Sequence, residues 1–500
     1  MSEKPRAWRC TVCGYIHAQI EAPDCCPVCG ADQADFEPYS PPAPTPPAPF
    51  RAQRWQCVIC DYFHEGPEPP ETCPLCGVNR DQFQPLPEVD PVGTDSGTPA
   101  QILIVGCGIA GVSAAETIRR VSPQSSITLV GTEGELPYYR LNLTRYLAGE
   151  IPREALPIHP AAWFEDQHIG LIRNVNVDRI NAEAHSVTLS NGLELPYDRL
   201  ILAAGSHAYI PSLEGVHLEG VFTLRTTVDA DHLIHRAQAG TRCVCIGGGI
   251  LGIEIAGALA RQKVAVTLLE SHAWLMPRQL NLRAAGVLER HLLSLGIQVV
   301  KKAQTRALIG ETRVSGVALQ DGPILPADVV VLATGVRPNT ALARKAGLEV
   351  NNGVVVDNHL RTSLPDIFAA GDAAEHNGQV YGAWSASQYQ GTIAALNAVG
   401  IPTAFGGLPR ANTVKALGLD LTSIGKFQPE DGSYTVLEQE GTADYITFIF
   451  HDSRLAGAIL IGHADLAATV KKAIESKTDF SALLQKNPAI PEILAALRPA

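Results

Sequence analysis

Residues 102–118 read ILIVGCGIAGVSAAETI, and residues 243–259 read CVCIGGGILGIEIAGAL. Each segment begins with a short apolar run, passes through a glycine-rich turn and continues into the start of a helix. Two such strand–turn–helix units in one chain predict two α/β domains, each built around a parallel sheet. The three glycines of each turn follow the spacing G-x-G-x-x-G; they are Gly106, Gly108 and Gly111, and Gly247, Gly249 and Gly252.

The glycine spacing has a physical reason. The first glycine permits the tight turn, the second lets a ligand approach the backbone, and the third lets the helix pack closely on the strand. A pyrophosphate would sit at the N-terminus of the helix that follows. We therefore predict two Rossmann-like three-layer dinucleotide-binding domains. Three further residues of these turns are expected to contact the cofactors: Ala110, Ile250 and Leu251.

Acidic residues after the second strand of each unit are candidates for binding a ribose. Glu270 stands 18 residues past Gly252, directly after the apolar run 264–269. Its carboxylate can accept both ribose hydroxyls of NADH and would repel a 2′-phosphate, so we expect NADH rather than NADPH. In the first unit Gly131 follows the strand, and Glu133 is the nearest candidate.

Cysteines are concentrated at the N-terminus, where nine of the twelve lie within the first 76 residues. A repeat at a shift of 47 residues gives two copies of C-x2-C, twelve residues, then C-P-x-C-G. Two such turns facing each other make a tetrahedral cage of four thiolates, which suits zinc or iron. Cys25 has no counterpart in the second copy and is predicted to be a spare thiol. The predicted ligands are Cys10, Cys13, Cys26 and Cys29, and Cys57, Cys60, Cys73 and Cys76.

Net charge and hydropathy limit the classes of partner and the location that the chain can have. A net charge of −12 argues against nucleic acid and anionic membranes as partners. The N-terminus has no secretory signal pattern and no apolar run reaches the ~18 residues of a membrane span, so we expect a cytoplasmic protein.

The predicted units are module 1 (1–39), a Pro-rich linker (40–54), module 2 (55–86), a linker (87–99), the first dinucleotide domain (100–220 and 339–405), the second (221–338) and a C-terminal α+β domain (406–500).

The cysteine modules resemble a known family. The order Trp-x-Cys-x-x-Cys-Gly-Tyr, then Cys-Pro-x-Cys-Gly, then an aromatic residue is similar to rubredoxin, and the short central gap is similar to the module that ends rubrerythrins. In the second copy Asp61 replaces the glycine. The resemblance implies two small metal knuckles, each with one iron that passes one electron at a time. A zinc ribbon stays an open alternative.

The remaining chain resembles the flavoproteins that contain two dinucleotide folds. In that family FAD occupies the first fold and NAD(P)H the second. Leu202–Gly205, Leu332–Gly335 and the segment 351–372 are similar to the family's crossover strands and its second FAD segment. The resemblance implies further cofactor contacts at Arg140, Val177, Ala204, Gly205, Gly335, Gly371 and Asp372.

Within this family the chain is similar to NADH:rubredoxin oxidoreductases and to the flavoprotein part of nitrite reductase large subunits. The stretches LPYYR (136–140) and YGAW (381–384) match the flavin-side loop and the flavin-covering helix of that branch. For Trp384, simple core packing is an equal alternative. The resemblance also implies that Glu254 orients the ribose next to the nicotinamide, with no catalytic side chain besides the cofactors.

One absence directs the functional hypothesis. Disulfide reductases of the family carry reactive cysteines beside the flavin, but residues 140–145 read RLNLTR. We therefore expect electrons to pass from NADH through FAD to the two iron modules. They would leave to a terminal reductase that acts on oxygen, superoxide or peroxide, or to free rubredoxin. The alternatives are an NADH oxidase with zinc ribbons for partner binding, or electron input to nitrite reduction. A homodimer is a further expectation.

Overall fold

The computed structural model describes residues 7–12, 16–17, 22–25, 31–39, 54–57, 62–65, 67–74, 78–85, 99–407, 411–416 and 418–497. Most of the two predicted linkers lies outside these residues. So do the predicted ligands Cys13, Cys26, Cys29, Cys60 and Cys76.

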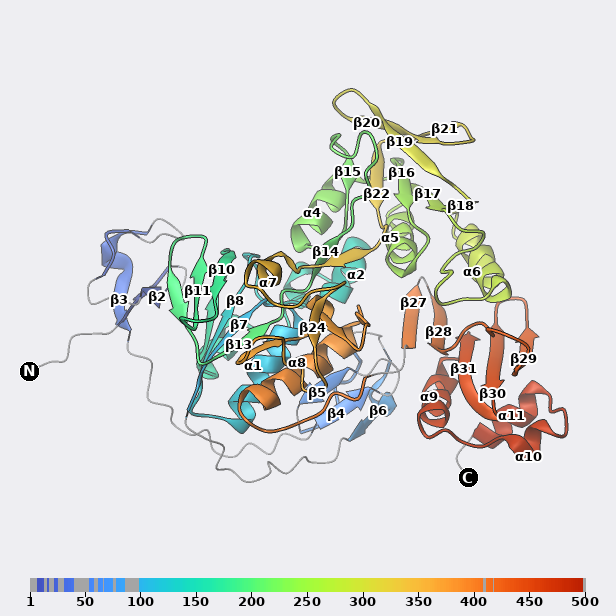
Figure 1. The fold of residues 1–500 in the computed structure, drawn as a ribbon. Helices are drawn as coiled ribbons and strands as arrows, with labels where there is room; N and C mark the ends of the chain where they lie inside the picture. Colours follow the sequence, from blue (N-terminus) through green and yellow to red (C-terminus); the bar gives the residue numbers. More distant parts are fainter. Residues whose placement is uncertain are drawn as a thin grey trace, which may run out of the picture.

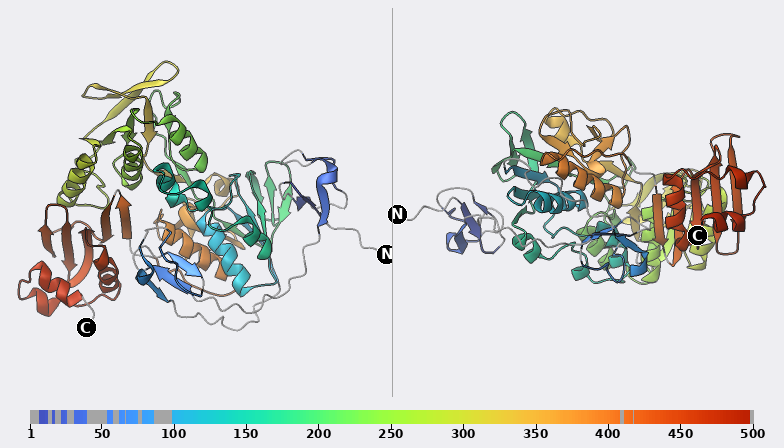
Figure 2. Two further views of the ribbon diagram at one scale, coloured as in Figure 1. Left: turned by 180° about the vertical axis from the view of Figure 1, so that it is seen from behind. Right: turned by 90° about the horizontal axis from the view of Figure 1, so that it is seen from below.

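The two N-terminal modules share one architecture, as the sequence repeat predicts. Module 1 pairs β1 (Ala7–Cys10) with β2 (Ile16–His17) and β3 (Phe36–Tyr39), and module 2 pairs β4 (Arg54–Cys57) with β5 (Phe63–Glu65) and β6 (Phe83–Pro85). The register is also repeated, because Cys10 lies opposite Phe36 and Cys57 lies opposite Phe83. The modules occupy different places on the molecule: module 1 lies beside β10 and β11, and module 2 lies beneath α8 (Figures 1 and 2).

The first dinucleotide domain contains a five-stranded parallel sheet in the order β25-β13-β7-β8-β9. Its strands are Ile367–Ala369, Arg199–Leu202, Gln101–Val105, Ser126–Val130 and Ile169–Ile172. Because β25 comes from a segment far along the chain, the second dinucleotide domain interrupts the first. The accompanying elements are α1 (Ile109–Val121), η3 (Arg140–Asn142), α2 (Leu143–Leu147), α3 (Ala161–Asp166), β10 (Val177–Asn181), β11 (Ser186–Leu189), β12 (Glu194–Pro196), α7 (Ala341–Lys345), β24 (Val354–Val356), β26 (Ala374–His376) and α8 (Trp384–Ala398).

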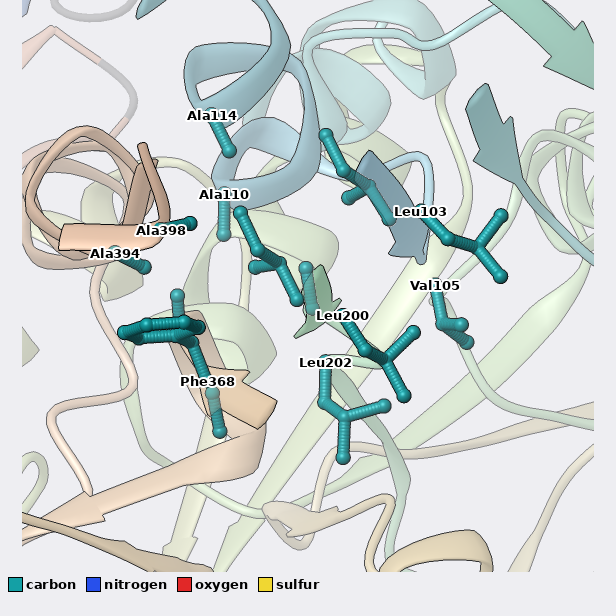
Figure 3. Close-up of a cluster of buried hydrophobic side chains, with 14 of the residues drawn as sticks. Leu103, Val105, Ala110, Ala114, Leu200, Leu202, Phe368, Ala394 and Ala398 are labelled. Carbon is teal, nitrogen blue, oxygen red and sulfur yellow. The ribbon is translucent and has the colours of Figure 1, made fainter. Parts of the chain in front are cut away.

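Small side chains allow two helices of this domain to pack closely. Leu103, Val105, Leu200, Leu202 and Phe368 fill the core beside the sheet (Figure 3). The facing residues of α1 and α8 are alanines, including Ala110, Ala114, Ala394 and Ala398. At Gly391 of α8 an added Cβ would lie 2.2 Å from the carbonyl oxygen of Ala110, so the two backbones touch there. This contact fixes α8 against the helix that follows the first glycine turn.

The second dinucleotide domain repeats the plan with the parallel order β15-β22-β16-β17-β18. Its strands are Val221–Phe222, Val329–Leu332, Arg242–Ile246, Ala265–Glu270 and Gln298–Lys301. Its helices are α4 (Thr227–Arg236), α5 (Ile250–Arg261) and α6 (Leu282–Ser294), and an antiparallel sheet adds β19 (Thr305–Gly310), β20 (Val314–Leu319) and β21 (Ile324–Pro326). A short pair, β14 (Ser206–Ala208) with β23 (Val336–Pro338), connects the two domains.

The C-terminal domain is an antiparallel sheet flanked by helices. Its order is β27-β28-β31-β30-β29, built from Ala411–Ala416, Leu419–Gly425, Arg454–Ile461, Tyr445–His451 and Tyr434–Glu440. The helices are α9 (Ala467–Glu475), α10 (Ser481–Leu484) and α11 (Ile490–Leu497). The predicted fold class is confirmed: two three-layer α/β domains, an α+β domain and two small N-terminal modules. The boundaries drawn between them stay predictions.

Candidate functional site

The first glycine turn and the start of α5, the helix that follows the second turn, line a single cavity of about 1350 Å³ between the two dinucleotide domains. Most of the predicted cofactor residues line it: Gly106, Gly108, Ala110, Glu133, Arg140, Val177, Ala204, Gly205, Ile250, Leu251, Glu254, Gly371 and Asp372. The predicted residues that do not line it are Gly111, Gly247, Gly249, Gly252, Glu270 and Gly335.

The first turn has the geometry that a bound pyrophosphate requires. Gly106 has φ +120°, and a Cβ there would lie 2.0 Å from the carbonyl oxygen of Ala203. A Cβ at Gly111 would lie 2.0 Å from the carbonyl oxygen of Gly106, so the helix and the turn touch. Around Gly108, in contrast, no protein atom lies within 4 Å of an added Cβ. The free space at the N-terminus of α1 therefore fits a phosphate.

The second turn repeats this geometry residue for residue. A Cβ at Gly247 would lie 2.4 Å from the carbonyl oxygen of Ala333, and one at Gly252 would lie 1.8 Å from that of Gly247. The middle glycine, Gly249, again has no protein atom within 4 Å of an added Cβ. Both turns thus fit a dinucleotide. Ile250 and Leu251, the first two residues of α5, line the cavity.

Glu270 ends β17 and is 5% exposed. Its Oε2 accepts a hydrogen bond of 3.0 Å from the amide of Gly248, and its Oε1 accepts one of 2.8 Å from the amide of His272. The carboxylate is therefore fixed beside the glycine turn, where the sequence predicts a ribose. Its role in binding that ribose stays a prediction.

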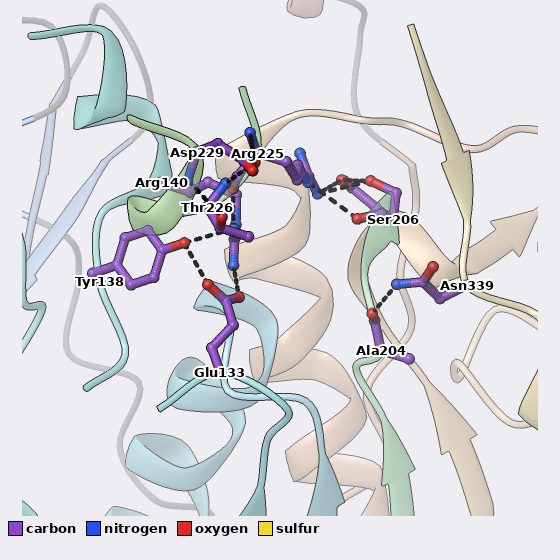
Figure 4. A network of polar contacts seen from close by, with 10 residues as sticks. Glu133, Tyr138, Arg140, Ala204, Ser206, Arg225, Thr226, Asp229 and Asn339 are labelled. Carbon is purple, nitrogen blue, oxygen red and sulfur yellow. Dashed lines mark hydrogen bonds and ion pairs between the residues drawn. The ribbon is translucent and has the colours of Figure 1, made fainter. Parts of the chain in front are cut away.

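Glu133 has a different environment (Figure 4). One carboxylate oxygen pairs with the guanidinium of Arg140, and the other accepts a 2.7 Å hydrogen bond from the hydroxyl of Tyr138. Arg140 also donates to Tyr138 at 2.7 Å and to the carbonyl oxygen of Arg225. Glu133 lies in the cavity wall, but both of its oxygens are already bound by protein groups.

Asp372 lies in a second polar cluster, which no local sequence pattern indicates. Its Oδ2 accepts 2.7 Å and 3.1 Å bonds from Ser206 and Arg225, and its Oδ1 accepts one of 3.3 Å from Ser387. Burial lowers the pKa of Arg225, while Asp372 opposes that shift. Arg225 precedes Thr226, which forms a capping box with Asp229 at the start of α4. The box is visible in the sequence, but the partner of Arg225 lies 147 residues away.

Glu254 projects from α5 into the cavity. Burial raises the pKa of its carboxyl from 4.5 to about 7, and the nearby hydroxyl of Thr144 offsets part of that rise. The Thr144 Oγ1 lies 3.3 Å from Oε2 of Glu254. A carboxyl group thus enters the cavity from α5 and can gain or lose a proton near neutral pH. Its role in orienting a ribose stays a prediction.

The described thiols near the dinucleotide turns are poor nucleophiles. Cys107 lines the cavity, and burial raises its pKa to about 12. Cys243 and Cys245 are buried in β16, and their mutual contact and burial raise the pKa of Cys243 well above its usual value. Because the thiolate is the reactive form, these residues behave as small apolar side chains.

Trp384 both lines the cavity and packs against an aromatic neighbour. Its ring lies 5.6 Å from that of Tyr139, whose ring lies 6.2 Å from that of Tyr62 in module 2. The two tyrosine hydroxyl oxygens are 3.2 Å apart. Nε1 of Trp384 is buried and has no hydrogen-bond partner. The two interpretations of Trp384, cavity lining and packing, therefore both apply.

The metal sites stay predictions. Cys10, Cys57 and Cys73 are buried, and Cys25, the predicted spare thiol, is exposed. The other five predicted ligands lie outside the described residues, and within those residues no cluster of three or more ligand-type side chains occurs.

Three family models match the chain. The model described as pyridine nucleotide-disulphide oxidoreductase covers residues 100–391, and the one described as the rubredoxin NAD+ reductase C-terminal domain covers 411–478. The rubrerythrin rubredoxin-like domain matches twice, at 8–37 and 55–84. None of the helices in the described part of the chain has the length and apolar character needed to cross a bilayer.

Individual relatives and solved structures that are similar to the chain are also oxidoreductases. The chain is 31% identical over 386 residues to a nitrite reductase [NAD(P)H] of Bacillus subtilis, covering 76% of this chain and 48% of that protein. It therefore spans about half the length of that relative. NADH:rubredoxin oxidoreductase from Clostridium acetobutylicum is similar in structure, with a TM-score of 0.67 and 28% identity over 80% of this chain and all of that one. A covalent putidaredoxin reductase–putidaredoxin complex gives a TM-score of 0.73, 27% identity, and coverage of 81% and 100%.

Proposed function

Because this chain belongs to the pyridine nucleotide-disulphide oxidoreductase family, we propose that it oxidises NADH and delivers electrons to its own N-terminal modules. It is an NAD(P)H-dependent flavoprotein oxidoreductase with rubredoxin-like modules. FAD occupies the first dinucleotide fold and NADH the second. Each module holds one iron in a cage of four cysteines. A downstream redox protein, or free rubredoxin, then takes the electrons.

One observation carries this proposal: the first glycine turn and the start of the helix after the second line the same cavity, and Cys107, the one thiol among the described cavity-lining residues, has a pKa raised to about 12. Two cofactors bound at these turns would bring their rings together in this cavity. A disulfide reductase needs a reactive thiol beside the flavin, which this wall lacks. Electrons must therefore leave toward another acceptor, and the chain itself carries two candidates.

The residues of the first fold suit FAD. The open space at Gly108 and the N-terminus of α1 would receive its pyrophosphate. Arg225 and Ser206 hold Asp372 in the cavity wall, where its carboxylate can accept a hydroxyl of the ribityl chain. When bound, FAD supplies the chemistry that converts a hydride into single electrons.

The residues of the second fold suit NADH. Gly249 leaves space for the pyrophosphate, and Glu270 presents a fixed carboxylate to the adenosine ribose. A 2′-phosphate would meet that negative charge, and His272 and Ser271 provide no guanidinium to balance it. Glu254 orients the other ribose from the cavity side.

The number of electrons that one NADH supplies matches the number of modules. One NADH would give one NAD+, one proton and two electrons, enough to reduce one ferric ion in each of the two four-cysteine modules. A downstream protein that takes one electron from each module would restore both to the ferric state. The Pro-rich linker would keep the module that it tethers at a high effective concentration, roughly millimolar for a linker of this length.

An anaerobic visible spectrum with metal analysis tests the proposal. We expect two irons per FAD, ferric–thiolate absorption over the flavin bands, and bleaching of both on addition of NADH. Zinc in place of iron, with only the flavin bleaching, would refute it. In that case oxygen consumption by the intact protein identifies an NADH oxidase.

A further inference from the structure

The two modules have the same sequence pattern but different contacts. In module 1, Cys10 and Phe36 form a small apolar cluster against which Leu193, between β11 and β12, is packed. In module 2, Cys57, Tyr62, Cys73 and Phe83 belong to an apolar cluster shared with the C-terminal domain. Figures 1 and 2 show module 2 beside α8, and module 1 at the far side of the first dinucleotide domain.

Module 2 contacts the region beside the cavity through two side chains, Tyr139 of the flavin-side loop and Arg145 of α2. Tyr62 is 7% exposed, and its ring meets that of Tyr139 at 6.2 Å with an interplanar angle of 67°. The guanidinium of Arg145 donates to the carbonyl oxygen of Pro74 at 3.4 Å. Pro74 directly follows the predicted ligand Cys73, so this second contact holds the ligand turn itself.

These contacts form a continuous series from the predicted metal site to the cavity. The amide of Cys57 donates a 2.8 Å hydrogen bond to the carbonyl oxygen of Tyr62. Tyr62 contacts Tyr139, which contacts Trp384 at 5.6 Å, and Trp384 lines the cavity.

We propose that module 2 is the resident electron acceptor of the flavin site, docked by Tyr62 on Tyr139 and connected to the cavity through Trp384. This inference rests on the proposed function, because it assumes that electrons leave the flavin for the modules. Each electron that passes along this contact reduces one ferric ion of module 2 to ferrous. Module 1 receives its electron later, from module 2 or by leaving its place beside β11.

The test uses the full chain with one iron site removed at a time. Cys10→Ser leaves iron in module 2 only, and Cys57→Ser leaves it in module 1 only. After rapid anaerobic mixing with NADH, module 2 should bleach faster than module 1 by about tenfold or more, because an undocked module reaches the flavin only at the concentration its tether sets.

Docking is measured separately by hydrogen–deuterium exchange. Tyr139→Ala should raise deuterium uptake in residues 54–57 and 62–65, while the ferric bands report that the module remains folded. In the Cys10→Ser background the same change should slow bleaching by about tenfold. Tyr62→Phe removes only the hydroxyl contact and should give a smaller effect. Tyr15→Phe, at the matching position of module 1, is the control and should change neither measurement.

The outcomes separate the two proposals. Equal bleaching rates in the two cysteine variants, or unchanged exchange in Tyr139→Ala, would overturn the docking of module 2 and leave the proposed function standing. Flavin reduction without bleaching of either iron would overturn the proposed function, and with it the role of module 2 as an acceptor.

Discussion

The two dinucleotide domains have the same turn but complete their sites differently. In the second domain, Glu270 follows β17 directly and bonds the amide of Gly248 in the adjacent turn. In the first, Glu133 stands beyond the strand and is held by Arg140 and Tyr138. The second site is therefore made by neighbours in one sheet, whereas the first needs residues from a loop, from the inserted domain and from the returning chain.

This difference shows that a motif fixes only the part of a site that the turn itself builds. The glycines leave the same open space at the start of both helices, as their equal geometry shows. The rest of the cavity wall depends on partners such as Arg225 and Asp372, which lie 147 residues apart. Perturbing each part separately tests this division.

Filling the glycine turns should have the largest effect. Gly111→Ala and Gly252→Ala each place a Cβ 2.0 Å or less from a carbonyl oxygen, so we expect losses of stability of about 3 kcal/mol or more. Gly108→Ala and Gly249→Ala are the matched controls, because their Cβ atoms meet no protein atom within 4 Å. The controls should fold normally in thermal unfolding but lose affinity for FAD and NADH respectively. Equal melting temperatures in all four variants would contradict this interpretation.

The second-largest effect is expected for Arg225→Ala, which changes the site of the first dinucleotide domain. It leaves Asp372 without its cation in a part-buried setting, where the side chains of Arg225 and Asp372 are 26% and 17% exposed. Breaking such a pair should cost about 3 kcal/mol and lower FAD retention. Arg242→Ala breaks the exposed Arg242–Asp328 pair and should cost less than about 1 kcal/mol. Thermal unfolding and bound-flavin absorbance measure both; a similar loss in the two variants would refute the distinction.

The third prediction concerns Glu254, whose counterpart two residues past the last glycine of the first turn is Ser113. Because burial raises the pKa of Glu254 from 4.5 to about 7, the folded state favours the neutral form. Its stabilising effect is complete below about pH 4.5, declines as pH rises to about 7, and is then lost. Glu254→Gln should therefore reduce the fall in melting temperature of the NADH-free protein between pH 5.5 and 8, by the equivalent of about 2 kcal/mol. Ser113→Ala, the control, should leave the pH profile unchanged.

The smallest effect is expected for nucleotide choice. Glu270→Gln with Ser271→Arg removes a negative charge and adds a guanidinium beside the ribose site. The ratio of NADH to NADPH affinity should move toward NADPH by about tenfold, or 1.4 kcal/mol. Glu133→Gln removes the same charge from the first domain and should leave the ratio unchanged. Titration of both nucleotides measures it, and an unchanged ratio in the double variant would exclude Glu270 from ribose selection.

The sequence predicted the parts of the fold that local patterns encode. Apolar runs followed by G-x-G-x-x-G identified both parallel sheets, and the 47-residue repeat identified two modules with the same register. It could not predict that Arg225 and Ser206 hold Asp372, because no local pattern joins segments so far apart. Nor could it separate the modules, since Tyr15 and Tyr62 occupy matching positions. Only the surface that each module meets makes them different.

The interruption of the first dinucleotide domain has a consequence for synthesis. β25 completes its sheet beside β13, yet the whole second domain is translated between them. A nascent chain leaving the ribosome can close the sheet of the second domain at β22, while the first still lacks its edge strand and α8. The second dinucleotide domain should therefore fold first during translation, and completion of the first should wait until residues near 400 have emerged.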